Sequence, residues 1–202
     1  MADTVAVAEL ALRSHDADWD RARWESLPEN GNRYEVIDEV LYTTTAPSNA
    51  HQWILRLIFL ELYRQLDSRN LGVTLWSPIG LFMPGCDPVQ PDLLFVRTAE
   101  RHILQGRHIS GVPALLIEIL SPSNARQDTE IKLAAYARAG VPEYWIARPV
   151  ERDALVHSDP DSGSGQYRRV RRIAPDGELV SPTLPFRAPL ASFFAGAPDA
   201  MA

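Results

Sequence analysis

Apolar and polar residues follow one another in short blocks along the chain, and most of these blocks predict β-strands. Residues 34–37 and 40–44 carry β-branched and aromatic side chains on both sides of a two-residue polar turn, which predicts a hairpin. Residues 73–76 and 79–83 show the same strand pattern, and a Pro-Gly pair ends the second of them. We therefore expect several short strands in the first half of the chain.

Two later blocks are apolar at successive positions. Residues 92–96 and 114–120 consist mainly of aliphatic residues, which is typical of strands buried on both faces. Residues 143–147 form a further strand-like run, and a polar loop at residues 159–165 separates two more candidate strands. We expect the two aliphatic runs to be central strands of a sheet.

Two segments show the patterning of helices. From a capping residue at Ser48 or Asn49 to about residue 66, apolar side chains recur at helical spacing and form one wide face. A second helix is predicted from a cap within residues 121–124 to Ala139, where Gly140 supplies the stop. The first helix is expected to pack its apolar face on the sheet.

The length of 202 residues and the hydrophobic content of 46% favour one principal domain. We expect a helical arm over residues 1–30, a domain over residues 31–195 and a flexible tail over residues 196–202. No apolar stretch reaches the roughly 20 residues that a membrane span needs, and the N-terminus lacks the pattern of a signal peptide. Because Cys86 is the only cysteine, the sequence predicts a cytoplasmic protein without an intramolecular disulfide.

The charge of the chain argues against binding nucleic acid by bulk electrostatics. The net charge is −6 and the pI is near 5.4, whereas phosphate contacts need clustered basic residues. The densest basic run comprises Arg168, Arg169, Arg171 and Arg172. Such a run is more often a solvated face, but it is where phosphate contacts are expected if DNA binds. Among the 20 basic residues, Lys132 is the one lysine.

Glu118 is a carboxylate inside one of the aliphatic runs. Burying an unpaired carboxylate costs several kcal/mol, so Glu118 requires a partner, a proton or a metal. Asp92 opens the other aliphatic run, and antiparallel pairing of the two runs would bring Asp92 beside Glu118. Paired carboxylates with an open side are suitable ligands for Mg²⁺.

Lys132 lies on the helix that follows the strand of Glu118. An ammonium group there can stabilise a phosphate group or orient an attacking water molecule. The same residues also fit a simpler interpretation, a buried ion pair between Glu118 and Lys132 with Asp92 as a cap at the strand edge. Both interpretations stay open at this point, because burial and geometry decide between them.

Several motifs occur in an order that is similar to a known family. Gln90-Pro91-Asp92-Leu93 is followed by Ile-Glu-Ile-Leu-Ser-Pro-Ser at residues 117–123, by Lys132 and Tyr136, and by Gly-Val-Pro-Glu-Tyr-Trp at residues 140–145. These motifs resemble the Uma-type family of putative restriction endonucleases, within the PD-(D/E)xK nuclease superfamily. The similarity covers roughly residues 30–195.

The resemblance implies a restriction-endonuclease-like α/β (α+β) fold, in which helices flank a mixed central sheet. It implies a Mg²⁺-dependent endonuclease, with Mn²⁺ able to substitute, in which Asp92 and Glu118 bind the metal. Glu35 would complete the acidic set, and Lys132 would be the basic member. In the superfamily the lysine stands two residues after the second acid, which is Leu120 here, so the resemblance implies that Lys132 takes over from the adjacent helix.

Two positions depart from the family pattern, and two further residues have more than one interpretation. Glu39 stands where the family usually has glycine in the hairpin turn, and Arg148 stands where it usually has aspartate. Glu35 fits either the acid cluster or an ordinary salt-bridged strand position. His51 follows a helix cap, where a histidine usually caps or packs, and it is an accessory candidate for contact with phosphate.

The sequence therefore predicts a metal-dependent nuclease that acts on nucleic acid, with DNA as the expected substrate and a homodimer as the expected assembly. The alternative is a catalytically degenerate nuclease fold that acts as a binding or interaction module, which the acidic pI favours. No glycine-rich phosphate loop, His-Glu-x-x-His motif or paired cysteine spacing occurs, which argues against nucleotide binding and structural zinc.

Overall fold

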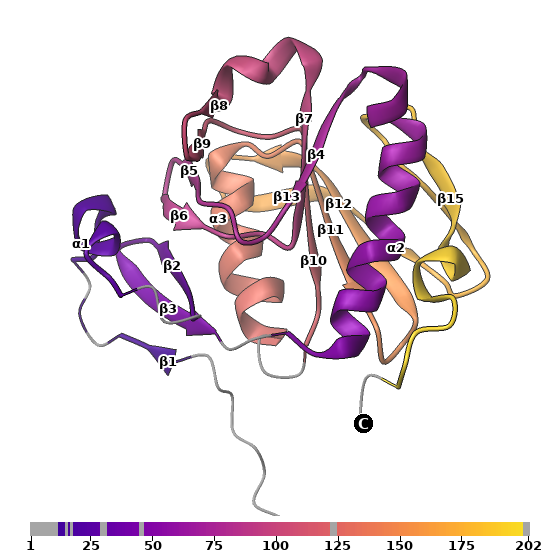
Figure 1. Cartoon of the computed structure of the whole chain (residues 1–202), viewed down its shortest axis with the longest axis horizontal. Coiled ribbons are helices and arrows are strands. Elements are labelled where there is room, and N and C mark those ends of the chain that lie inside the picture. Colours follow the sequence, from indigo (N-terminus) through magenta and orange to yellow (C-terminus); the bar gives the residue numbers. More distant parts are fainter. Residues whose placement is uncertain are drawn as a thin grey trace, which may run out of the picture.

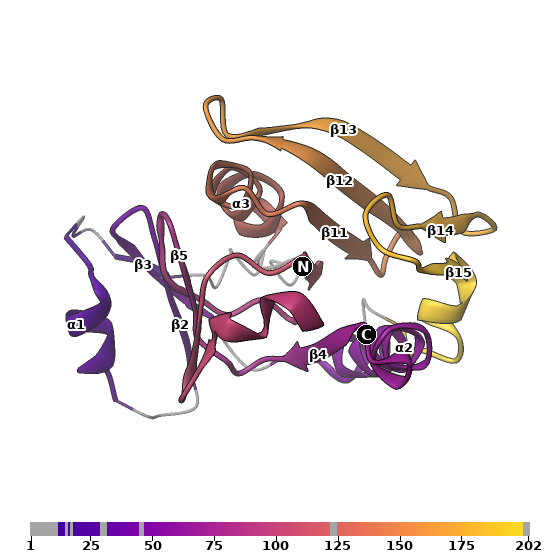
Figure 2. The same cartoon turned by 90° about the horizontal axis from the view of Figure 1, so that it is seen from above.

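The computed structural model describes residues 12–14, 16, 18–28, 32–44, 47–121 and 125–199. Figures 1 and 2 show a six-stranded sheet with helix α2 (Asn49–Gln65) on one face and helix α3 (Lys132–Ala139) on the other. A second sheet lies on the side of α3, so that α3 is enclosed between the two sheets.

The six-stranded sheet has the strand order β13-β12-β11-β10-β7-β4. Its strands are β4 (Gly72–Trp76), β7 (Leu93–Arg97), β10 (Leu115–Ile119), β11 (Glu143–Arg148), β12 (Asp153–Asp161) and β13 (Gln166–Ile173). Only β10 and β11 are parallel neighbours, and α3 lies in the crossover that a parallel pair requires. The predicted antiparallel pairing of the two aliphatic runs is confirmed, because Ile117 of β10 pairs with Leu93 of β7.

Strand β10 is buried on both faces, as its composition predicts. Leu115 and Ile117 belong to the core on the side of α2, whereas Leu116 belongs to the core on the side of α3. Because side chains alternate along a strand, Glu118 shares the face of Leu116. The carboxylate of Glu118 is therefore directed toward α3.

Helix α2 begins and ends close to its predicted limits. The side chain of Ser48 caps it by accepting a hydrogen bond from the backbone N–H of His51. Ile54, Ile58 and Leu62 recur at helical spacing and are buried against the sheet. The same core also takes the apolar residues near the C-terminus, including Phe193 of the 3-10 helix η4 (Leu190–Phe194).

The second sheet is also mixed and has the strand order β1-β3-β2-β6-β5-β9-β8. Its strands are β1 (Leu12–Arg13), β2 (Arg33–Ile37), β3 (Val40–Thr44), β5 (Leu81–Met83), β6 (Cys86–Val89), β8 (Leu104–Gln105) and β9 (His108–Ser110). The predicted hairpin is confirmed as β2 and β3, joined at Asp38 and Glu39. Both turn residues have positive φ angles, 48° and 63°, which is the conformation that glycine adopts most readily.

The N-terminal segment is described only in part. Among its described residues, helix α1 (Arg21–Glu25) is short, and Leu12–Arg13 pair with β3 as a strand. Residues 1–11, 15, 17, 29 and 30 of the expected helical arm lie outside the described residues, as do residues 122–124 of the expected cap and residues 200–202 of the expected tail. Strands β14 (Glu178–Val180) and β15 (Arg187–Pro189) form a separate two-stranded sheet. No described helix is long and apolar enough to cross a membrane.

His157 on β12 is an unusual member of the core on the side of α3. Its ring lies 6.0 Å from the ring of Tyr144 and 5.7 Å from that of Tyr167, between ring centroids. Both ring nitrogens are buried and make no hydrogen bond among the described residues. Burial, which disfavours the charged imidazolium, lowers the pKa of His157 from 6.5 to about 4.

This burial predicts a pH-dependent stability. Between pH 6.5 and about 4 the unfolded chain binds a proton at His157 that the folded chain excludes, so the free energy of unfolding falls as the pH falls through this range. The loss attributable to His157 is at most about 3 kcal/mol. Urea unfolding of a His157→Phe variant at several pH values should show a shallower decline than the wild type. The same substitution at the exposed His102 provides the control. Equal slopes of the free energy of unfolding against pH for His157→Phe and wild type would contradict the assignment.

Candidate active site

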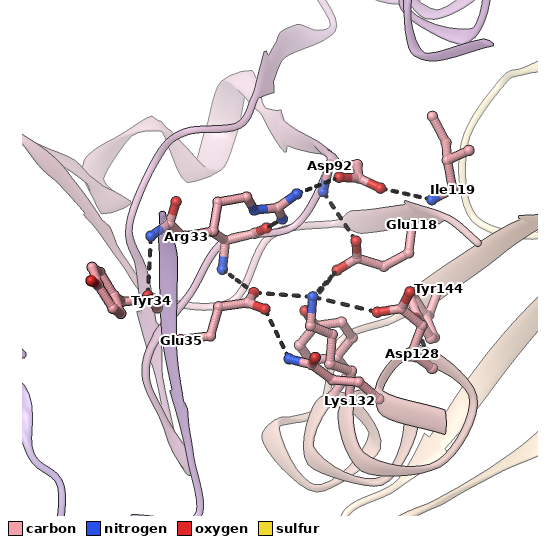
Figure 3. Close-up of polar contacts among 12 residues, drawn as sticks. Arg33, Tyr34, Glu35, Asp92, Glu118, Ile119, Asp128, Lys132 and Tyr144 are labelled. Carbon is pink, nitrogen blue, oxygen red and sulfur yellow. Dashed lines mark hydrogen bonds and ion pairs between the residues drawn. The ribbon is translucent and has the colours of Figure 1, made fainter. Parts of the chain in front are cut away.

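Four buried carboxylates surround the ammonium group of Lys132 or lie next to it (Figure 3). They come from separate elements: Glu35 from β2, Asp92 from the residue before β7, Glu118 from β10 and Asp128 from the π-helical turn η3 (Gln127–Ile131) that precedes α3. Each of these five side chains is at most 5% exposed. The site therefore joins both sheets to the helix between them.

Lys132 is the centre of the cluster. Its Nζ lies 2.8 Å from Glu118 Oε1, 3.0 Å from Glu35 Oε1 and 3.5 Å from Asp128 Oδ1. Burial alone would lower the pKa of Lys132, but these three carboxylates raise it above its usual value. The ammonium group therefore stays protonated at neutral pH.

The local backbone of β10 and β7 fixes Glu118 and Asp92 against each other. The backbone N–H of Asp92 donates to Glu118 Oε2 at 3.3 Å, and the backbone N–H of Ile119 donates to Asp92 Oδ2 at 2.8 Å. The hydroxyl of Tyr136 donates to Glu118 Oε1 at 3.2 Å. The antiparallel pairing thus places the two acids on one face, as the sequence predicts.

Glu35 is held by polar groups on either side of it. It accepts hydrogen bonds from the backbone N–H of Gln90 at 2.7 Å and from the side-chain amide of Gln127 at 3.0 Å. Glu35 is therefore buried and salt-bridged to Lys132 within the cluster, so that both interpretations of this residue describe it in part.

Asp92 is the member of the cluster that lines a pocket. Its Oδ1 accepts a hydrogen bond from Arg33 at 2.9 Å and lies 3.3 Å from Nε2 of His51. Asp92, Arg33 and His51 together line a pocket of about 280 Å³, with Gln90 and Ser77 among its other walls. A ligand can therefore approach Asp92 from this side, whereas Lys132 lies deeper.

The charges of the cluster are not balanced. Four carboxylates face two permanent cations, Lys132 and Arg33, which leaves two negative charges if all the acids ionise. Burial raises the pKa of Glu118, and nearby carboxylates raise it further, although Lys132 opposes the shift. Burial likewise raises the pKa of Asp128, to about 6, again against Lys132. Burial would also raise the pKa of Asp92, but His51 and Arg33 lower it below its usual range.

The described residues include no group of three or more His, Cys, Asp or Glu side chains arranged as ligands of one metal ion. The carboxylates of Glu35, Glu118 and Asp128 converge on the ammonium group instead. Asp92 and Glu118 are nevertheless adjacent hard oxygen donors beside a pocket. Mg²⁺ commonly uses one or two carboxylates and keeps its remaining positions for water and phosphate, so this donor pair fits it chemically.

A family model described as putative restriction endonuclease (Uma2) matches residues 21–191. The chain belongs to this family. Among solved structures, a putative nuclease belonging to DUF820 from Anabaena variabilis ATCC 29413 has a TM-score of 0.73 at 16% identity, covering 88% of this chain and 98% of that chain. The restriction-endonuclease-like fold with a mixed sheet and flanking helices is thereby confirmed. No curated protein matches the chain.

The structure brings all five sequence-predicted residues of this family member together: Glu35, His51, Asp92, Glu118 and Lys132. The sequence analysis did not identify Asp128 and Arg33. Each had a detectable signal, because Asp128 stands four residues before Lys132 on a helical segment and Arg33 shares a strand face with Glu35. The irregular π-helical turn, a feature frequent at functional sites, carries Asp128.

The arginine run lies along β13, at an edge of the six-stranded sheet. Acidic residues offset part of its charge: Arg168 lies 3.2 Å from Asp161, and Arg172 lies 2.5 Å from Asp153. Arg148, which replaces the usual aspartate of the family, pairs with the same Asp153 at 2.5 Å. The charge of the run is therefore only partly offset, because Asp153 is shared by two arginines and Arg171 donates to the backbone carbonyl of Val180.

Replacing Lys132 by the similarly shaped but uncharged Met should destabilise the fold. The substitution leaves buried carboxylates without their cation, and the expected loss in the free energy of unfolding is about 3–5 kcal/mol. Urea unfolding measures it. Adding Glu118→Gln to Lys132→Met should recover part of the loss, because one uncompensated charge is then removed. Arg126→Met breaks an exposed pair with Glu130 and should cost less than about 1 kcal/mol, and a similar cost at Lys132 would contradict the structural role.

Proposed function

We propose that this member of the family is a Mg²⁺-dependent nuclease that hydrolyses phosphodiester bonds of nucleic acid, with DNA as the expected substrate. The observation that carries the proposal is the buried Lys132 within 3.0 Å of Glu118 and Glu35, next to an Asp92 that reaches a surface pocket. Burying an ammonium group among several carboxylates is costly for stability, so a functional reason for the arrangement is favoured.

Asp92 and Glu118 would hold the divalent cation, and Mn²⁺ could replace Mg²⁺. The four carboxylates support this, because they would exceed the two cations by two charges if all were ionised, and a dication would favour their ionised forms. When bound, such an ion supplies Lewis-acid stabilisation of the negative charge on the phosphate. The residues around the ion would stabilise and position the phosphate.

Among those residues, Lys132 would act as a fixed positive charge. Its raised pKa keeps it protonated, so it would stabilise charge that develops on the scissile phosphate or orient the attacking water molecule rather than accept a proton. Glu35 assists by holding the ammonium group in place. Arg33 and His51 line the pocket and would position the phosphate on the side of Asp92.

A nicking assay on supercoiled plasmid DNA, with Mg²⁺ or Mn²⁺, tests the proposal. Wild-type protein should nick the plasmid, and Glu118→Gln and Lys132→Ala should each lower the rate at least about 100-fold, a typical effect of removing one electrostatic contact in the transition state. Glu118→Gln keeps the shape of the side chain and so separates lost chemistry from lost packing.

The exposed Glu130 supplies a matched control, because Glu130→Gln makes the same chemical change outside the cluster. Its nicking rate should equal that of the wild type. Unchanged nicking in both Glu118→Gln and Lys132→Ala would overturn the assignment of the site.

A second candidate function is a catalytically inactive member that acts as an interaction module. The observation that favours it is the absence, within the described part of the chain, of three side chains that converge as metal ligands. In that case the carboxylates would remain paired with Lys132 and would not bind a metal ion.

Titration calorimetry with Mn²⁺ separates the two candidates. The nuclease proposal predicts binding at or below millimolar Mn²⁺, weakened at least about tenfold in Asp92→Asn because one of two carboxylate ligands is lost. Glu130→Gln should bind like the wild type. A wild-type protein that takes up no Mn²⁺ at millimolar concentration would favour the interaction module. The homodimer and the cytoplasmic location stay predictions from the sequence.

A further inference from the structure

A second, larger pocket adjoins the pocket of Asp92. It has a volume of about 670 Å³, against about 280 Å³ for the first. Asn32, Pro78 and Gln90 line both pockets, so the two are neighbours along one surface. A chain molecule whose phosphate lay at Asp92 would therefore place its adjacent group in the second pocket.

Aromatic rings from three elements line this second pocket. Trp24 comes from α1, Tyr34 from β2 and His108 from β9, and all three are partly exposed. Tyr34 lies on the opposite side of β2 from Glu35, as Figure 3 shows, so consecutive residues of this strand serve the two sites.

Packing fixes the orientation of two of these rings. The centroid of Trp24 lies 6.1 Å from that of His108, and both rings stand edge to face against the buried ring of Phe82, at 5.9 and 5.1 Å. The indole N–H of Trp24 also donates to the backbone carbonyl of Tyr34 at 2.9 Å. The wall is therefore formed before any ligand binds, which lowers the entropy cost of binding.

The charges of the second pocket differ from those of the first. Its lining includes one cation, Arg107, and one acid, Glu25, so it carries no net formal charge. The amide side chains of Asn32 and Gln90 stand at the boundary of the two pockets. Aromatic faces with amide groups and no net charge suit a neutral planar ligand that carries hydrogen-bonding edges, rather than a phosphate.

We propose that this pocket binds an unpaired nucleobase next to a phosphate that Arg33 and His51 position in the first pocket, so that the protein prefers single-stranded or locally unpaired nucleic acid. The inference rests on the proposed function of the neighbouring site. A base within a duplex is stacked on both faces and cannot present a face to Trp24 or His108, whereas an unpaired base can. The acidic surface is consistent with this, because stacking contributes binding energy without a basic face.

Fluorescence anisotropy with a labelled single-stranded oligodeoxynucleotide tests the proposal in the presence of EDTA. No hydrolysis then occurs, and binding is measured by itself. The single strand should bind at least about tenfold more tightly than a duplex of the same sequence. An oligomer of the same length with abasic sites keeps the phosphates and lacks the bases, so it should bind about tenfold more weakly than the intact strand.

Variants locate the binding. Trp24→Leu and His108→Ala should each weaken single-strand binding about tenfold, and Trp24→Phe should recover most of the loss because it restores a stacking face. Trp53→Leu removes a partly exposed indole that lines neither pocket, and it should bind like the wild type. Thermal melting identifies any variant that is unfolded. Arg107→Ala changes an exposed residue of the pocket lining, so it tests the same pocket at a position where the fold is not at risk.

Equal binding of Trp24→Leu, His108→Ala and wild type, or equal binding of the abasic and intact strands, would overturn the nucleobase pocket. These results are independent of catalysis, because the assay contains no metal. Plasmid nicking together with unchanged binding by the variants would overturn the pocket and leave the nuclease standing. Loss of binding in the variants of a protein that never nicks DNA would support the pocket and reject the nuclease.

Discussion

The contact between the buried ammonium group of Lys132 and the carboxylates of Glu35, Glu118 and Asp128 is the interaction on which the rest of the structure depends. It joins a strand of each sheet to the helical segment between them. Because a buried charge is tolerated only when it is paired, each of these elements is held in position by the others. The same contact fixes the geometry of the candidate active site, so the stability of the fold and the proposed function involve one group of atoms.

The site has a closed side and an open side. On the closed side Lys132 lies between the two sheets, while on the open side Asp92 lines a pocket with Arg33 and His51. Glu118 and Asp128 lie between these two sides. Burial and mutual repulsion both disfavour their charged forms, so their pKa values are raised. A cation that entered from the open side would meet oxygen donors already held by backbone hydrogen bonds.

The surroundings of the site suggest how an acidic protein can act on an anionic polymer. The main arginine run lies on an edge strand, local aspartates offset part of its charge, and none of its residues lines either pocket. Recognition would then depend on local features, with phosphate at Arg33 and His51 and a base against Trp24 and His108. The departure of Arg148 from the family pattern fits the same picture, because Arg148 neutralises Asp153 at the end of β11.

The family, the hairpin, the two aliphatic strands and the proximity of Asp92, Glu118 and Lys132 could be predicted without the structure, because each depends on a short-range pattern or an ordered motif. The remaining features depend on contacts between residues that are distant in the chain. Arg33 contacts Asp92 and Glu35 contacts Lys132 across long stretches of the chain, and no local pattern encodes these distances. Of the two interpretations that the sequence left open, the structure shows the buried ion pair between Lys132 and Glu118, whereas metal binding by Asp92 and Glu118 stays a proposal.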